Sequence, residues 1–364
     1  MKNLKIIYFV ILLVLVAMLS TGPALAQESE TALQGLLDQQ VQEQDILGMA
    51  MAVRLADGTV IGKASGYSDP SGEEAWSVDT VSAIGSVTKT FTAVVIMQLV
   101  EEGKLSLDDT IDTWFPQQPN GDKITIRMLL SHTSGLNIYI RGPKLMEGHW
   151  AREWAPMELV AEANKLGPVG EPGSSEALYS NTNYILLGLI VEEVTGNSLA
   201  QEVETRIIKP LGLRDTTFLW KEDVLDIMIG GYIQMEDGYQ NFLELPWLPH
   251  PSTTWAAGDI VSTVSDLMTF ASALFDGDLV LKETLEIMAE PVGTDVANGF
   301  LWGLGGGTLD GAGPRTFAMG GGMPGYRALY VGSLDSKVLV VALLNTDHGS
   351  LYEPTLMALQ YLTQ

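Results

Sequence analysis

The hydrophobic positions of the chain repeat with two different periods, and the period changes between its ends and its middle. Near the N-terminus, two strand-like runs at 48–55 and 59–67 are separated by the turn dipeptide Asp57-Gly58, which predicts a β-hairpin. The last hundred residues contain further alternating or apolar runs, separated by glycines and turns. These runs, which predict antiparallel strands, are 300–309, 316–321, 326–333 and 337–344.

Helical spacing of apolar residues dominates most of the remaining chain. The segments with this spacing are 31–43, 86–103, 124–130, 184–195, 199–208, 267–275, 281–288 and 351–362. Strands at both ends and helices in the middle predict an α+β fold, in which one sheet is built from both termini and carries a helical insertion. We expect 141–157, which contains glycine, proline and tryptophan, to form a mobile segment over a cleft, and 221–255 to be rich in loops.

The first 26 residues have the pattern of a secretory signal. Lys2 and Lys5 give a basic start, the uncharged run 6–19 is apolar, and Ala24-Leu25-Ala26 has the small residues of a cleavage site. The apolar run is short for a membrane-spanning helix, so the pattern favours cleavage near Ala26 over a retained anchor. No later stretch is long and apolar enough to span a bilayer. We therefore expect a secreted or periplasmic protein whose mature part is residues 27–364.

Composition narrows the class of function. The net charge of −25 becomes −27 if Lys2 and Lys5 are removed, and such a surface repels nucleic acid and anionic lipid. We therefore expect a small-molecule or peptide substrate and no nucleic-acid partner. The chain has no cysteine, which excludes lipid attachment through a thiol, thiolate metal sites and a cysteine nucleophile. With 46% hydrophobic residues, the composition is that of a packed globular protein.

Ser86 and Lys89 are the first candidates for chemistry, at the start of a predicted buried helix. Positions i and i+3 of a helix share a face, so the Lys89 amine can reach the Ser86 hydroxyl. Burial would disfavour the charged form of Lys89 and leave a neutral amine to activate the serine. The positive end of the helix would also favour negative charge near Ser86. The spacing alone leaves open an ordinary solvated lysine, because such a pair is expected about once by chance in a chain this long.

Several other catalytic patterns are missing from the sequence. No Gly-x-Ser-x-Gly elbow occurs, which argues against an α/β-hydrolase. There is no His-Glu-x-x-His or paired-carboxylate metal signature, and the glycine and lysine of 58–63 have the wrong spacing for a phosphate loop. The histidines are scattered, at His132, His149, His250 and His348. The serine and lysine thus have no zinc or nucleotide motif as a competitor.

Three motifs in a fixed order resemble those of the penicillin-recognising serine hydrolases. They are Ser86-x-x-Lys89, Tyr179-x-Asn181 and the glycine-rich Met319-Gly320-Gly321 before a terminal strand. This family includes class C β-lactamases, D-alanyl-D-alanine carboxypeptidases, D-amino-acid peptidases and esterases built on the same scaffold. Longer sequence segments also resemble the family and occur in the expected order, at 102–109, 130–136, 179–184, 210–216 and 257–263.

The resemblance extends from about Leu33 to the C-terminus and implies a β-lactamase/transpeptidase-like fold. In that fold, an antiparallel sheet flanked by helices forms an α/β lobe, here at about 31–103 and 256–364. An all-α lobe, at about 104–255, lies between these two parts of the sequence. The active site would lie in the groove between the lobes.

The resemblance also implies roles for individual residues. Ser86 would be the acylated nucleophile, Lys89 its base, and Tyr179 the carrier of the proton between the serine and the leaving group. A phenol normally loses its proton too late for that role, so Tyr179 would need the Lys89 cation beside it. Asn181 would hydrogen-bond the acyl-side amide of the substrate and Lys89. The backbone N–H groups of Ser86 and Gly322 would form the oxyanion hole.

The third motif departs from the family pattern. Met319 stands where the family has lysine or histidine, at the start of the substrate-binding residues Met319, Gly320, Gly321 and Gly322. The loss of this cation or donor weakens recognition of the carboxylate of β-lactams and terminal D-alanine, unless Arg327 on the following strand supplies the charge. Since esterase branches of the family tolerate an uncharged residue there, Met319 favours small acyl esters as substrates.

Together, these observations predict an exported serine hydrolase that needs no metal or cofactor. Its substrate stays open among D-amino-acid peptides, β-lactams and carboxylic esters. The alternative is a non-catalytic relative that binds cell-wall peptide or acts as a sensor. The intact first two motifs argue against this alternative, whereas Met319 is compatible with it. Ser131 and His132 look catalytic by residue type, but their loop is mainly structural in the family, so we expect no chemistry there.

Overall fold

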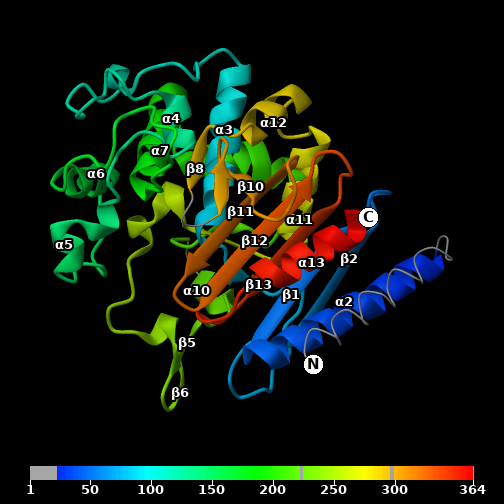
Figure 1. Ribbon diagram of the computed structural model, residues 1–364. Helices are drawn as coiled ribbons and strands as arrows, with labels where there is room; N and C mark the ends of the chain where they lie inside the picture. The colour runs from blue at the N-terminus through cyan, green and yellow to red at the C-terminus, as the bar shows by residue number, and fades with distance from the viewer. Residues whose placement is uncertain (1–22, 222–223, 296–298, 364) are drawn as a thin grey trace.

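The computed structural model describes residues 23–221, 224–295 and 299–363. Its largest sheet has eight strands in the order β2-β1-β13-β12-β11-β10-β9-β8, and all its neighbouring strands are antiparallel (Figure 1). The strands of this sheet are β1 (Gly48–Arg54), β2 (Val60–Gly66), β8 (Gly293–Asp295), β9 (Phe300–Trp302), β10 (Gly307–Leu309), β11 (Thr316–Met323), β12 (Tyr326–Ser333) and β13 (Leu339–Leu344). Because β1 pairs directly with β13, the predicted sheet built from both termini is confirmed.

Two small sheets accompany the large one. The first contains β3 (Ser82–Ala83), β7 (Ile260–Ser262) and β4 (Thr217–Phe218), and the second is the hairpin of β5 (Tyr232–Met235) and β6 (Gly238–Asn241). The helices are α2 (Pro23–Gln44), α3 (Thr88–Glu101), α4 (Ile126–Leu130), α5 (Pro143–Met146), α6 (Pro156–Asn164), α7 (Asn181–Thr195), α8 (Leu199–Val203), α9 (Lys209–Leu211), α10 (Val224–Ile227), α11 (Val264–Asp276), α12 (Lys282–Ala289) and α13 (Tyr352–Thr363).

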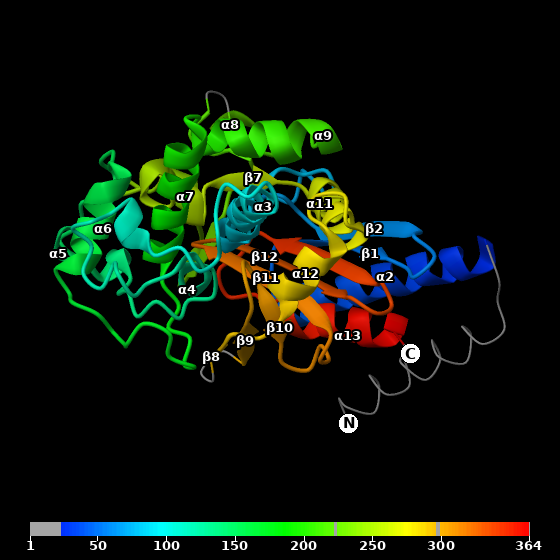
Figure 2. The same cartoon turned by 90° about the horizontal axis from the view of Figure 1, so that it is seen from above.

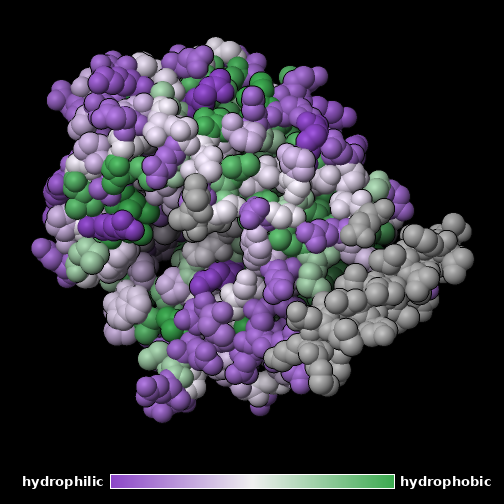
Figure 3. Space-filling model, in the orientation of Figure 1, coloured by the Kyte–Doolittle hydropathy of each residue, from purple (hydrophilic) through white to green (hydrophobic). Residues whose placement is uncertain are grey.

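Helices cover both faces of the large sheet. Figure 2 shows α2 and α13 on one face and α3 and α11 on the other, while α4 to α7 lie beyond the end of α3. All residues of β1 and β13 are buried, which explains why their sequences, apart from Arg54 at the end of β1, are continuously apolar instead of alternating. On the outside, hydrophilic residues cover most of the face drawn in Figure 3, and hydrophobic residues form separate small groups there.

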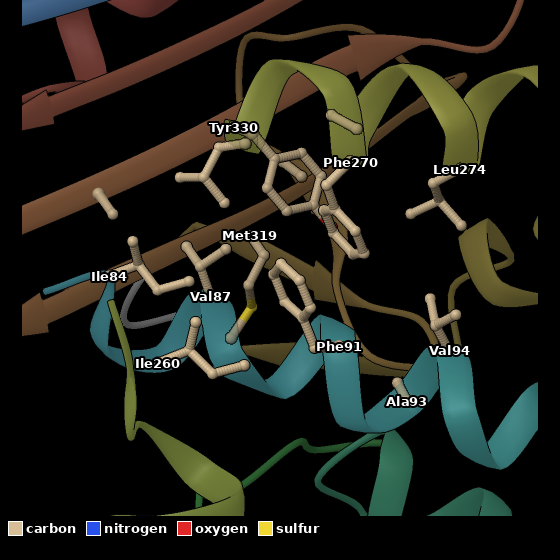
Figure 4. Close-up of a cluster of buried hydrophobic side chains, with 14 of the residues drawn as sticks. Ile84, Val87, Phe91, Ala93, Val94, Ile260, Phe270, Leu274, Met319 and Tyr330 are labelled. Carbon is tan, nitrogen blue, oxygen red and sulfur yellow. The ribbon is translucent and has the colours of Figure 1, made fainter. Parts of the chain in front are cut away.

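Helix α3 lies in the middle of the core and is buried on nearly every side. Phe91 of α3 stacks on Phe270 of α11, with ring centroids 3.8 Å apart. Figure 4 shows Met319 and Tyr330 of the sheet directed toward Val87 and Phe91 at the start of this helix. The start of α3, which carries Lys89, and the turn before it, which carries Ser86, are therefore held by apolar packing against β11 and β12.

The structure differs from the sequence-based predictions at several elements. The run 300–309 forms two strands joined by a tight turn, and the β5–β6 hairpin lies within the stretch predicted as loops. The segment 141–157 includes α5 and the start of α6, and it buries Leu145 and Trp154. None of its residues borders the cavity that contains Ser86, so its predicted position over the cleft is wrong.

The predicted signal segment lies almost wholly outside the described residues, and only its last residues, 23–26, are seen, as the start of α2. In the described part of the chain, no helix has the length and apolar character needed to cross a membrane.

Candidate active site

Ser86 lies in a tight turn between β3 and α3, against the glycines of β11. The turn is a 3-10 helix, Gly85–Val87, so Ser86 comes just before the α-helix instead of opening it. A Cβ on Gly321 would stand 1.9 Å from the Ile84 carbonyl oxygen, and Gly85 has a φ of +50°. Only glycine tolerates such close approach and such a backbone conformation without strain. These glycines thus bring the strand into direct backbone contact with the turn.

The two backbone nitrogens predicted for the oxyanion hole border this contact. The nitrogen of Ser86 lies 3.0 Å from the position of a Cβ on Gly321, and the nitrogen of Gly322 lies 2.9 Å from that of a Cβ on Gly85. The predicted residues Ser86 and Gly322 are therefore neighbours in space, although 236 positions separate them in the sequence.

Ser86, Lys89 and Tyr179 meet at their functional atoms. Ser86 Oγ lies 2.9 Å from Lys89 Nζ and 2.6 Å from Tyr179 Oη. Lys89 Nζ also donates a hydrogen bond of 2.6 Å to the carbonyl oxygen of Ala257. Tyr179 comes from the segment just before α7, so two separate parts of the chain meet at the Ser86 hydroxyl, and a third, at Ala257, contacts Lys89.

Burial sets the protonation of the two groups that flank the serine. Lys89 is 0% exposed, and desolvation holds its pKa well below the usual 10.5. Burial raises the pKa of Tyr179, and its hydrogen bond with Ser86 offsets only part of this rise. Burial therefore favours the neutral form of both groups, the amine of Lys89 and the phenol of Tyr179. The Lys89 cation predicted beside the phenol is disfavoured in this resting arrangement.

Aromatic faces surround the Lys89 amine. Nζ lies 5.1 Å from the ring centroid of Tyr179 and 5.5 Å from that of Tyr184. Ring faces attract a cation at such distances. If the amine takes up a proton, both rings can therefore stabilise the resulting ammonium.

Two predicted residues are placed differently from expectation. Asn181 begins α7, but no hydrogen bond joins it to Lys89 within the described residues, and its Oδ1 is buried without a partner there. Its amide instead lies near the hydroxyl of Tyr139. Met319 borders the cavity, yet its side chain is only 1% exposed and packs in the core beside α3 (Figure 4).

A cavity of about 510 Å³ opens beside Ser86 and Tyr179 and extends past Gly320 and Gly322. Much of its wall is apolar, with side chains from β9, β10, β12 and the residue just before α13. These side chains are Phe300, Trp302, Leu309, Leu329 and Leu351. The cavity therefore suits a ligand with an apolar group near the serine.

Arg327 lines the same cavity and is half-buried. Its Nη1 donates hydrogen bonds of 2.9 Å to the carbonyl oxygens of Met323 and Tyr326, and its Nη2 donates to that of Asp347. In the part of the chain that the structure covers, no carboxylate lies within ion-pair distance of this guanidinium. For the described residues we also find no group of three or more His, Cys, Asp or Glu that could hold a metal ion.

Sequence reasoning missed two groups next to the reacting atoms. The Ala257 carbonyl belongs to the phrase 257–263, which supported the resemblance but carried no role. The ring of His132 packs against that of Tyr179, with centroids 4.5 Å apart, and against Trp302 at the same distance. The segment 130–136, which resembles the family and contains His132, pointed to this region. Its residue types alone did not show that the His132 ring contacts Tyr179.

Comparison with known proteins gives consistent results. A family model described as Beta-lactamase matches residues 33–362. The putative penicillin-binding protein PbpX of Bacillus subtilis (strain 168) is 30% identical over 303 residues, which cover 83% of this chain and 71% of PbpX. Two solved structures cover more of both chains. A D-stereospecific amidohydrolase from Streptomyces sp. has 30% identity and a TM-score of 0.75, covering 90% of this chain and 98% of the other. The D-amino acid amidase from Ochrobactrum anthropi SV3, complexed with D-phenylalanine, has 27% identity and a TM-score of 0.80, covering 92% and 98%.

Proposed function

This chain belongs to the beta-lactamase family, and from that premise we propose that it is an exported serine hydrolase that forms an acyl-enzyme on Ser86. One observation carries the proposal: Ser86 Oγ lies between the amine of Lys89, at 2.9 Å, and the phenol of Tyr179, at 2.6 Å. A serine hydroxyl is a weak nucleophile unless a base within hydrogen-bond reach takes its proton. A buried neutral lysine is such a base.

Acylation then uses the groups in a definite order. Lys89 takes the proton of Ser86 as Oγ bonds to the substrate's carbonyl carbon, and the backbone N–H groups of Ser86 and Gly322 stabilise the oxyanion. The ammonium formed on Lys89 faces the rings of Tyr179 and Tyr184. When the carbon–leaving group bond breaks, Tyr179 gives its proton to the leaving group, and the Lys89 ammonium restores the phenol. In total, one proton passes from the serine to the leaving group.

Hydrolysis of the acyl-enzyme reverses these roles, with water in place of the leaving group. The water loses a proton as its oxygen bonds to the acyl carbon, and Ser86 regains a proton as its bond to that carbon breaks. The groups that supplied the proton in acylation accept one here, as microscopic reversibility requires of an acid–base pair.

The substrate we propose is an amide of a D-amino acid or a carboxylic ester with an apolar group. The apolar wall of the cavity, which includes Phe300, Leu309 and Leu329, supports this choice. The lack of a cation at Met319 also makes a β-lactam carboxylate a poorer ligand. In addition, two structures similar to this chain are described as a D-stereospecific amidohydrolase and a D-amino acid amidase.

Covalent labelling tests the proposal on the purified chain. A fluorophosphonate probe should label the wild-type protein and shift the mass of the peptide that contains Ser86, whereas Ser86→Ala should not be labelled. Ser131→Ala is the matched control, because Ser131 is buried and its Oγ bonds to the carbonyl oxygen of Arg127, so labelling should persist. If the wild-type protein stays unlabelled but binds penicillin reversibly, the non-catalytic alternative is correct instead.

Export is a separate part of the proposal and rests on the signal pattern at the N-terminus. If cleavage follows Ala26, N-terminal sequencing of the protein exported by a bacterial host should begin at Gln27. A chain that begins at Met1 in the cell-associated fraction would contradict this part and leave the proposed chemistry unaffected.

A further inference from the structure

His132 lies beside Tyr179 in the segment that follows α4, and it is 0% exposed. Its backbone has a φ of 60°, which is uncommon for a residue other than glycine. The two rings are tilted by 39°, with centroids 4.5 Å apart. A buried residue in an unusual backbone conformation, in direct contact with the proposed acid, invites a functional explanation.

His132 holds the chain on both sides of Tyr179. The N–H of Leu178 donates a 2.9 Å hydrogen bond to the carbonyl oxygen of His132. The N–H of Ser180 donates a 3.2 Å hydrogen bond to His132 Nδ1. One residue thus fixes the positions before and after Tyr179, and its ring supports the ring between them.

These hydrogen bonds also define the state of the imidazole. A backbone N–H can only donate, so Nδ1 must be the unprotonated nitrogen that accepts. Asn183 is oriented to match, because its Oδ1 accepts from Ser134 Oγ at 2.6 Å while its Nδ2 lies 3.0 Å from His132 Nδ1. Burial holds the His132 pKa well below 6.5. The ring is therefore neutral and carries its proton on Nε2.

The Nε2–H group has no hydrogen-bond partner among the described residues, although it is buried. Its surroundings are aromatic, and the ring meets Trp302 edge-on at 73°. Ring faces are only weak acceptors. Phenylalanine would remove this unsatisfied donor but also the acceptor for Ser180, and asparagine would supply an acceptor without the ring. Histidine meets both requirements at the cost of one weakly satisfied N–H.

We propose that His132 is a positioning residue that fixes the phenol of Tyr179 as the acid for the leaving group. The inference rests on the proposed function, because it assigns His132 no chemistry of its own. Tyr179 Oη must stay at 2.6 Å from Ser86 Oγ to serve both the serine and the leaving group. A misplacement of about 1 Å can cost about 100-fold in rate, so support of the phenol ring has a measurable value.

The test compares two esters that share one acyl group and differ in the leaving group. A p-nitrophenolate leaves without a proton, whereas an ethoxide leaving group needs one from an acid. His132→Phe keeps a ring but removes the Nδ1 acceptor. We expect its kcat/KM to fall about 10- to 100-fold for the ethyl ester and by less than about 3-fold for the p-nitrophenyl ester. The quantity compared is the ratio of kcat/KM for the ethyl ester to kcat/KM for the p-nitrophenyl ester. His132→Asn retains an acceptor, so this ratio should fall less in His132→Asn than in His132→Phe.

Two further variants make the result decisive. Tyr179→Phe should show the same dependence on the leaving group, and the double variant with His132→Phe should be no worse than Tyr179→Phe alone. Tyr330→Phe is the control for a buried ring that loses a hydrogen bond, here the one between its hydroxyl and Thr90 at 3.0 Å, and it should leave the ratio unchanged.

The outcomes separate the inference from the proposed function. If Tyr179→Phe lowers both esters equally, the acid role proposed for Tyr179 is wrong. If Tyr179→Phe is selective but both His132 variants lower the two esters equally or not at all, the inference about His132 is overturned. Should His132→Phe fail to fold, the same comparison with His132→Asn decides.

Discussion

The cluster around Ser86 and the glycine strand β11 differ in what their side chains contribute. In the cluster, the atoms that we propose to react belong to side chains: Ser86 Oγ lies 2.9 Å from Lys89 Nζ and 2.6 Å from Tyr179 Oη. Along β11, Gly320 and Gly322 have no side chain, and that of Met319 is packed in the core. In the proposed function, the cluster supplies the chemistry, while the strand supplies backbone groups and space for the substrate.

Replacement of Lys89 should have the largest effect and should not depend on the substrate. Lys89→Met removes the base, and we expect kcat/KM to fall about 1000-fold for every ester and amide tested. Lys89→Arg is the matched control that keeps a cation but cannot provide a neutral amine, so it should be equally impaired. Activity in the arginine variant near that of the wild type would show that a cation suffices at this position.

Two neighbouring glycines of β11 should respond very differently to the same substitution. A Cβ on Gly321 would stand 1.9 Å from the Ile84 carbonyl oxygen, whereas the nearest atom to a Cβ on Gly320 is 3.9 Å away. Gly321→Ala should push the strand from the Ser86 turn, lowering kcat/KM about 100-fold and the free energy of unfolding by about 1–3 kcal/mol. Gly320→Ala should unfold at the temperature of the wild type. Equal melting temperatures for both variants would contradict the described contact.

Arg327 tests whether the strand region selects substrates by charge. We expect Arg327→Gln to lower kcat/KM about 10-fold for a 3-carboxyphenyl ester, because a hydrogen bond to a charged group is lost. The phenyl ester with the same acyl group should be unaffected and serves as the control. An equal loss for both esters would mean that Arg327 acts only by holding the carbonyl groups of Met323 and Tyr326.

Met319 should give the smallest change in activity. Met319→Leu keeps the apolar volume in the core and should leave ester hydrolysis within about 3-fold of the wild type, since such swaps cost less than about 1.5 kcal/mol.

Met319→His would place an imidazole beside Val87 and Phe91, so we expect the free energy of unfolding to fall by about 1–3 kcal/mol. We expect no gain in β-lactam hydrolysis, measured with a chromogenic cephalosporin. A clear gain would instead support the interpretation that the missing cation limits recognition of β-lactams.

The sequence predicted the architecture well wherever a single pattern decided it. Strand-like apolar or alternating runs and turn dipeptides identified β1, β2 and β12 within one or two residues, and their order predicted a sheet from both termini. The β5–β6 hairpin was missed because Tyr232–Met235 and Gly238–Asn241 are short and all but one of their residues are half-buried or exposed, so they have no apolar alternation. The helices of the segment 141–157 were missed because its prolines mark helix starts as well as loops: Pro143 begins α5, after Gly142 at the N-cap, and Pro156 begins α6.

At the site, sequence spacing predicted which residues come together but not how each is oriented. The i, i+3 relation brought Lys89 to Ser86 even though the serine lies in a 3-10 turn. The inward direction of the Met319 side chain and the contact of His132 with Tyr179 depend on tertiary packing. No local pattern contains that information.

The most direct test of the account is the pH dependence of the second-order rate constant for labelling of Ser86 by a fluorophosphonate. Protonated Lys89 cannot accept the serine proton, so the rate should rise as this group loses its proton and level off well below pH 10.5, the usual pKa of a lysine. This step should be absent from Lys89→Met. A wild-type rate that does not vary with pH, or that still climbs through pH 10.5, would contradict the claim that a buried neutral amine activates Ser86.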